Sequence, residues 1–445
     1  MTAAHMPELP EVPHFGAHAL RLPNHAQRGE LNDEVHARPP ERLSSPVRLS
    51  YVAMLNDAPA SVIARDCVRQ LAASFKIQPP ERDQNHFSAD FGDFRLKWER
   101  HGEFTRYQFI VSGRERQPFA DPAINAIPAD WLITLPGEVL IAAHLVLEKT
   151  DAATVDPEDL STRYFRGNAL VGSRVASGAG LALTDFRIHE DGSSRFLLHD
   201  SNLTPRQAGR TVQRLLEMET YRMLALLALP IARELAPFLS QSEVELAGIA
   251  AQMIDADRST ERELLMRLTR LAAGIESRYA KNLFRFSAAS AYADLVIRRI
   301  SELKEERVAS LQTFREFMDR RFTPAMSTCR STVTRQEALS ARLSRATQLL
   351  STQVDVFLEQ QNQGILAAMN RRGRLQLRLQ QTVEGLSIAA VTYYVVGLVG
   401  YAAKAVHAAG LPINTEMAIG ISIPVVAGLA ALAVRRVHRL VEEHE

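Results

Sequence analysis

The chain has 445 residues, with 52 Lys and Arg against 51 Asp and Glu. This balance excludes a general nucleic-acid-binding protein, which would carry a marked basic excess. The cysteines Cys67 and Cys329 are far apart and fit a reducing cytoplasm, where we interpret both as packed thiols. The first 23 residues have no basic start and no continuous apolar core. They do not predict a signal peptide, so we expect the N-terminal part to stay in the cytoplasm.

Residues 1–203 alternate turn residues with β-prone apolar runs, which predicts a mixed α/β domain. Residues 61–75 have helical spacing, and His101-Gly102-Glu103 forms a short hairpin loop between two runs. The predicted strands cover residues 47–55, 94–98, 104–111, 139–147, 169–175, 182–188 and 195–199.

From residue 204 the composition turns helical, and we predict a long antiparallel stalk over residues 204–384. Thr204 caps a helix with Pro205 in its first turn, and this helix should run to about Leu229. A capping box of Thr260 and Glu263 opens a second long helix. Pro324 then marks a turn, and a third helix should begin near residue 331.

The third helix carries an apolar stripe, whose thirteen steps cover 47 residues at a mean of about 3.6, the period of a straight α-helix. The stripe consists of Leu339, Leu343, Ala346, Leu350, Val354, Phe357, Gln361, Ile365, Ala368, Arg372, Leu375, Leu379, Val383 and Leu386. A helix this long is unstable alone in water, so it must pack on the preceding helix, on copies of itself, or on both. Gln361 and Arg372 are either surface positions at the stripe edge or polar layers that fix an oligomer's register.

Two uncharged apolar stretches, residues 385–403 and 417–434, are each about long enough to cross a bilayer as a helix. A buried hairpin of a soluble protein is the alternative, but its helices would usually carry some charge on one edge. Basic residues precede the first stretch and follow the second, whereas the loop at 404–416 has a single Lys. The positive-inside rule therefore places both chain ends, including the basic tail 435–445, in the cytoplasm. The fold class is α+β: a mixed α/β domain, a helical stalk and a two-helix transmembrane hairpin.

Neither stretch contains an ionisable Asp, Glu, Lys, Arg or His, so a proton relay inside the membrane is not expected. Polar and small side chains in the first stretch either line a pore or allow close helix packing. These candidate residues are Thr392, Tyr393, Tyr394, Gly397, Gly400 and Tyr401. Glu416 is the only carboxylate of the outer loop.

The segment Glu34 to Pro39 combines a carboxylate, an imidazole and a guanidinium within six residues. Glu34, His36 and Arg38 either bind a ligand such as an anion, or tie the N-terminal segment to the sheet by hydrogen bonds. The sequence contains no P-loop, no Gly-x-Ser-x-Gly, no His-Glu-x-x-His and no Cys-x-x-Cys motif. We therefore expect no enzyme, no catalytic residue, no metal and no cofactor.

The Glu-Val-His-Ala-Arg-Pro motif at 34–39, together with the terminal hairpin, resembles a bacterial family of uncharacterised membrane-anchored proteins over nearly the whole chain. The architecture also resembles the CorA-like magnesium and zinc transporter superfamily. That resemblance implies homopentamers whose first span lines a pore and ends in Gly-Met-Asn. Here a glycine-rich turn is expected at Gly397 to Tyr401, with no Met-Asn, so selective conduction of divalent cations does not follow.

These observations predict a bacterial inner-membrane protein, crossing twice, that serves a structural or regulatory role. The alternative is a CorA-like cation channel with a non-standard filter. The expected partners are the lipid bilayer, further copies of the chain, and a cytoplasmic ligand or protein.

Overall fold

The computed structural model describes residues 25–29, 31–32, 39–81, 84–113, 117–150, 155–254, 258–408 and 414–442. The chain divides into two compact units. The sheet unit comprises Met1–Ala247 and Arg270–Arg342, and the terminal unit comprises Gly248–Thr269 and Leu343–Glu445. The sheet unit therefore includes most of the residues between 204 and 342 as well as the β-rich part.

The sheet is mixed, with strand order β2-β3-β4-β1-β5-β8-β7-β6-β9. Its strands are β1 (Val47–Leu55), β2 (His86–Asp90), β3 (Arg95–Arg100), β4 (Phe104–Ser112), β5 (Glu138–Lys149), β6 (Val171–Val175), β7 (Gly180–Thr184), β8 (Ser194–Asp200) and β9 (Glu306–Arg307). Strands β5 and β8 pair in parallel, and the other pairs are antiparallel. The predicted mixed α/β class is confirmed.

The helices are α2 (Ala58–Ser74), α3 (Ala129–Leu132), α4 (Pro157–Tyr164), α5 (Pro205–Leu226), α6 (Ala228–Gln252), α7 (Arg258–Leu303), α8 (Phe314–Arg321), α9 (Thr323–Ala408) and α10 (Thr415–Glu442), with a 3₁₀ turn η1 (Ala123–Ala126). The predicted cap of α5 is present, because the Thr204 hydroxyl accepts from the Gln207 amide and the Gln207 side chain accepts from the Thr204 amide.

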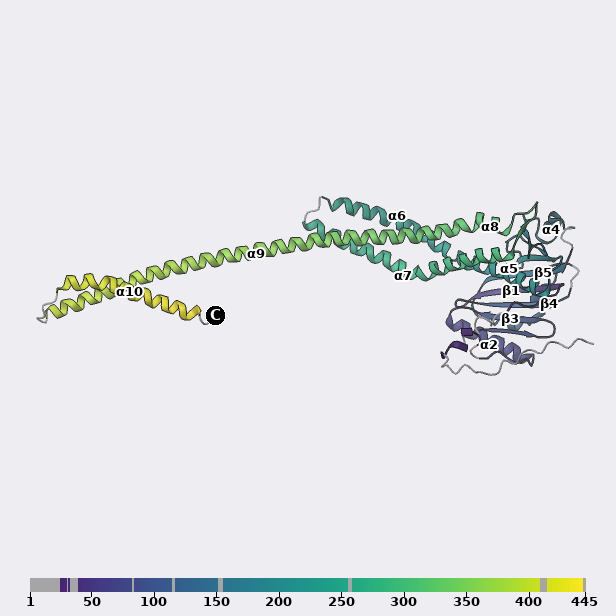
Figure 1. Cartoon of the computed structure of the whole chain (residues 1–445), viewed down its shortest axis with the longest axis horizontal. Helices are drawn as coiled ribbons and strands as arrows, with labels where there is room; N and C mark the ends of the chain where they lie inside the picture. The colour runs from purple at the N-terminus through teal and green to yellow at the C-terminus, as the bar shows by residue number, and fades with distance from the viewer. Residues whose placement is uncertain are drawn as a thin grey trace, which may run out of the picture. The chain divides into compact units, whose positions relative to one another are not determined.

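Helices cover both faces of the sheet (Figure 1). Side chains alternate along a strand, so Leu49 and Tyr51 of β1 face one side while Val52 and Met54 face the other. The first side packs on α5 and on parts of α7 to α9, and the second packs on α2 and α3 beside a further cluster around α4. The long α5 thus packs directly on the sheet within the sheet unit.

Gly209 seats α5 against the chain segment that precedes β1. A Cβ atom at this position would collide with the backbone carbonyl of Glu41. The same segment is held by a hydrogen bond from the Leu43 amide to the Pro205 carbonyl, 3.1 Å long. Glycine is therefore required here for close approach of two backbones, not for its backbone conformation.

The structure differs from the predictions at several element ends. Strands β2 and β9 were not predicted: β2 is a half-exposed edge strand, and β9 has only two residues from the otherwise helical part. Helix α5 ends at Leu226, and Pro230 lies in the first turn of α6, where its missing amide hydrogen has no helical partner to lose. Pro324 likewise lies in the first turn of α9, which starts eight residues before the predicted position at 331.

Candidate functional site

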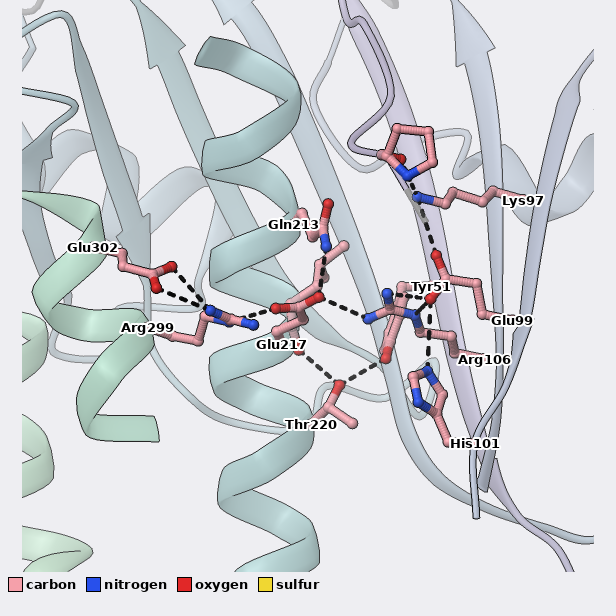
Figure 2. Close-up of polar contacts among 12 residues, drawn as sticks. Tyr51, Lys97, Glu99, His101, Arg106, Gln213, Glu217, Thr220, Arg299 and Glu302 are labelled. Atoms are coloured by element: carbon pink, nitrogen blue, oxygen red, sulfur yellow. Dashed lines mark hydrogen bonds and ion pairs between the residues drawn. The ribbon is translucent and has the colours of Figure 1, made fainter. Parts of the chain in front are cut away.

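A buried network of charged side chains links the sheet to the helices within the sheet unit (Figure 2). Its sheet half comes from β3 and β4, where Glu99 pairs directly with Arg106 across the strands. Arg106 Nε donates to Glu99 Oε2 at 2.7 Å, and Lys97 Nζ lies 3.1 Å from Glu99 Oε1. All three side chains project toward α5, on the face opposite the aromatic core.

The helical half of the network comes from α5 and α7. Glu217 accepts from Arg106 Nη1 at 3.1 Å and from Arg299 Nε at 2.5 Å. Gln213, one turn earlier on α5, donates to the same carboxylate at 2.7 Å. Arg299 also donates from Nη1 to both oxygens of Glu302, at 3.1 and 2.9 Å. Glu217 therefore bridges a cation from the sheet and a cation from α7.

A neutral hydrogen bond runs beside the ions. Tyr51 Oη donates to Thr220 Oγ1 at 2.7 Å, because the Thr220 hydroxyl itself donates to the Leu216 carbonyl. Burial raises the pKa of Tyr51, so the phenol remains a neutral donor at any physiological pH. The half-buried His101 lies on the other side of Glu99, with its Nε2 atom 3.6 Å from Glu99 Oε2.

Both central carboxylates stay ionised in the folded chain. Burial alone would raise the pKa of Glu99, but His101, Arg106 and Lys97 outweigh it and hold the pKa well below its usual range. Burial also opposes ionisation of Glu217, and the guanidiniums of Arg106 and Arg299 again hold its pKa below the usual range. The stability that this pairing contributes is therefore lost when the pH falls low enough to protonate these two carboxylates.

The network joins four cations, Lys97, Arg106, Arg214 and Arg299, to the carboxylates of Glu99, Glu217 and Glu302. Each of these groups already contacts a partner of opposite sign, so the cluster offers neither a free nucleophile nor a vacant anion site. The cluster instead holds β3, β4, α5 and the C-terminal half of α7 together through its ion pairs.

The network also reaches the N-terminal segment, since Lys97 Nζ donates to the Pro39 carbonyl at 2.8 Å. Glu41, two residues on, accepts from Ser88 Oγ at 2.7 Å. The predicted ligand residues Glu34, His36 and Arg38 lie outside the described residues. Their role stays a prediction. The residue that follows them is tied to the sheet by a hydrogen bond.

One Ser-His-Asp arrangement lies elsewhere in the sheet, but it does not present a nucleophile. Ser50 Oγ and His144 Nδ1 are 2.9 Å apart, and His144 Nε2 is 3.9 Å from Asp191. Ser50 is fully buried in β1, and its oxygen also accepts from the Ile124 amide at 2.9 Å. Burial lowers the pKa of His144, so this histidine is a neutral core residue. Among the residues that the structure describes, no group of three His, Cys, Asp or Glu side chains is placed to hold a metal ion.

A groove of the sheet unit runs between α7, α8 and the start of α9, with a volume of about 630 Å³. Its floor is apolar, with Phe286, Phe322 and Met326, and its rim carries both Asp294 and Arg315. The mixed sign of the rim selects neither an anion nor a cation.

The family described as "Protein of unknown function (DUF3422)" matches residues 23–441. The chain belongs to this family. The match includes the whole sheet and both terminal helices, so the DUF3422 family joins these two parts in one chain. No curated protein and no solved structure matches the chain.

In this DUF3422 protein, three helical stretches are long and apolar enough to cross a membrane: Pro205–Gln252, Phe314–Ala408 and Thr415–Arg436. In the first, 33% of the most apolar 18-residue window is buried, and Leu224, Ala225, Ala228 and Ala232 lie in the core of the sheet unit. The other two are more exposed. In the second stretch 11% of its most apolar 18-residue window is buried, and in the third stretch none of the corresponding window is buried.

The predicted pore or packing residues lie on the last part of α9. Tyr393, Tyr394 and Tyr401 are exposed, whereas Gly400 packs against Ile419 of α10, where an added Cβ would meet the isoleucine side chain at 3.2 Å. Together with Thr392 and Gly397 they line a groove of about 960 Å³ between α9 and α10. The expected turn at residues 397–401 is wrong. This segment is helical throughout, because uninterrupted apolar sequence favours the helix over a glycine turn. Glu416 lies in the first turn of α10.

Proposed function

We propose that the chain is an integral membrane protein of the bacterial inner membrane, held by the end of α9 and by α10, with a structural or regulatory role. The observation that carries this proposal is the exposure of two uncharged apolar stretches of membrane-spanning length, at the end of α9 and in α10. Each apolar Leu, Ile, Val or Phe near a span's centre favours insertion by about 0.3–0.6 kcal/mol, and no charged residue opposes it. Left in water, the same surface would be a severe aggregation liability.

The flanking charges support an orientation with the sheet unit in the cytoplasm. Arg371, Arg372, Arg374 and Arg378 precede the first span, and Arg435 and Arg436 follow the second. The connection between the spans contains Lys404 as its single Lys or Arg. Lys and Arg next to spans are retained on the cytoplasmic side, so both ends of the chain belong there.

The proposed role of the sheet unit rests on the paired and buried state of the charged groups that the structure describes in it. The charges of the network are paired with one another, and the serine and histidine of the Ser-His-Asp arrangement are buried in the core. A unit of this kind suits the positioning of a binding surface at the membrane better than catalysis. The apolar groove between α7 and α9 is the surface where a protein or small-ligand partner would bind.

Alkaline extraction of membranes tests the anchor. Full-length protein should stay in the pellet after a carbonate wash. A Leu398→Arg, Leu429→Arg double variant, which costs about 3 kcal/mol per span, should be released. A matched Leu398→Ala, Leu429→Ala variant should stay. Release of the unmodified chain would refute the proposal.

A pore remains the alternative use of the same spans, because Thr392 and three exposed tyrosines lie on one hairpin. A pore built from one hairpin per chain needs several copies. A monomeric mass in mild detergent would reject it, whereas a symmetric pentamer that passes Mg²⁺ or monovalent ions in liposomes would replace the anchor role with transport.

A further inference from the structure

The apolar stripe of α9 is covered at its start and bare further along. Leu343 and Leu350 are fully buried within the terminal unit, which also contains the adjoining ends of α6 and α7. After Phe357 the helix has no covering neighbour in the described part of the chain, and every residue from 358 to 383 is exposed. The stripe itself continues through Ile365, Leu379 and Val383, with Gln361 and Arg372 as its two polar positions.

This bare helix cannot be stable as a lone element. Residues 358–383 span about 39 Å at 1.5 Å per residue, and single helices of such length depend on packing of an apolar face. Exposed apolar residues are normal when scattered. Here Leu366 and Leu377 lie off the stripe, but Ile365, Leu379 and Val383 recur on one face of the helix. Because this face continues the one that is buried around Leu343 and Leu350, it needs a second helix with an apolar face to cover it.

We infer that this face is covered by the same face of a second copy of the chain, in parallel and in register. The inference rests on the proposed membrane anchor, since two helices that enter one bilayer from the same side must run in the same direction. Leu350, Gln361, Arg372 and Val383 are spaced by 11 residues, a repeat that produces a nearly straight or slightly right-handed pair of helices.

The parallel arrangement also suits the two polar positions of the stripe. In register, Gln361 meets its own copy, and a carboxamide is both donor and acceptor, so the two side chains satisfy each other. Such a polar layer specifies register and orientation at some cost in stability. The long side chain of Arg372 can place its guanidinium in water outside the helix–helix contact, while its methylene groups cover the apolar surface of that contact.

Oxidative cross-linking of variants with one added cysteine, in isolated membranes, tests the inference. Gln361→Cys lies on the stripe, and Gln363→Cys, two residues on, lies about 200° around the helix, on nearly the opposite face. Both glutamines are exposed, so neither change disturbs folding. The native Cys67 and Cys329 are buried, so the unmodified chain serves as the background control.

We expect the oxidised Gln361→Cys protein to form roughly tenfold more disulfide-linked dimer than Gln363→Cys, because a disulfide requires Cα atoms within about 7 Å. Equal cross-linking of the two variants, no cross-linking of Gln361→Cys in the membrane pellet, or an adduct of a different mass would overturn the inference. Absence of the protein from the pellet would instead overturn the proposed anchor, so the two failures are distinguishable.

Discussion

Glu217→Gln isolates the energetic contribution of the bridge between sheet and helices. The carboxylate of Glu217 is only 5% exposed and contacts two cations, at 3.1 and 2.5 Å. Removal of one partner from a buried ion pair costs about 3–5 kcal/mol. Here Arg106 keeps Glu99 and Arg299 keeps Glu302, so we take the lower end, about 3 kcal/mol, or roughly two powers of ten in the unfolding equilibrium constant.

Glu302→Gln is the matched control, because it removes the same charge from Arg299, and with it the 3.2 Å contact of Glu302 with Arg214 of α5. Its side chain is 34% exposed, and an exposed ion pair contributes only about 0.2–1 kcal/mol. The two tryptophans of the chain, Trp98 and Trp131, are both buried in the sheet unit, so their fluorescence during urea unfolding in mild detergent reports that unit alone. Midpoints that shift equally for the two variants would refute the assignment of the bridge to Glu217.

Three further predictions use the same fluorescence measurement. Gly209→Ala should lower the free energy of unfolding by about 1–3 kcal/mol, because the new Cβ collides with a backbone carbonyl. Gly274→Ala is the control: its Cβ has room, so the change should be neutral or stabilising by up to about 1 kcal/mol. Similar losses for both variants would contradict the close approach of the two backbones at Gly209. Tyr51→Phe should cost about 1–3 kcal/mol, since the buried Thr220 hydroxyl loses its donor, and a cost near zero would show that the bond contributes nothing. Because the pKa of buried His144 is lowered in the folded chain, the unfolded chain takes up a proton on this histidine at a higher pH than the folded chain does. The free energy of unfolding should therefore fall from pH 7 to pH 5, and this fall should be smaller in His144→Gln. An unchanged pH dependence in the variant would show that His144 is not responsible.

Much of the sheet was predictable because its strands carry strong local signals. The hairpin loop at His101-Gly102-Glu103 separates β3 from β4 as predicted, and the apolar run of β5 lies at the sheet's centre. The strand β9 carries no such signal. Two residues, Glu306 and Arg307, pair with β6 only because the end of α7 brings them there.

The buried network was not predictable from its sequence pattern. Lys97 and Glu99 alternate with Leu96 and Trp98, which normally indicates a strand with one face in water. That face is instead covered by α5, whose Glu217 lies more than a hundred residues away in the sequence. Long-range pairing of charges leaves no local signal, and only the fold brings these groups together.

The terminal helices show the opposite situation, in which the sequence is more informative than the fold. Their length, apolarity and flanking arginines predict two spans, and the structure adds that both helices expose their apolar surface. The crossing itself stays a prediction. So do the ligand residues Glu34, His36 and Arg38, which lie outside the described residues.

Labelling with a membrane-impermeant maleimide tests the central claim, that the chain crosses the bilayer twice with its sheet unit inside. Glu416→Cys lies in the connection between the spans, and Gln348→Cys lies on α9 well before the first span, both exposed. In intact cells, Glu416→Cys should be labelled and Gln348→Cys should be labelled only after lysis. Labelling of both variants only after lysis would contradict the account.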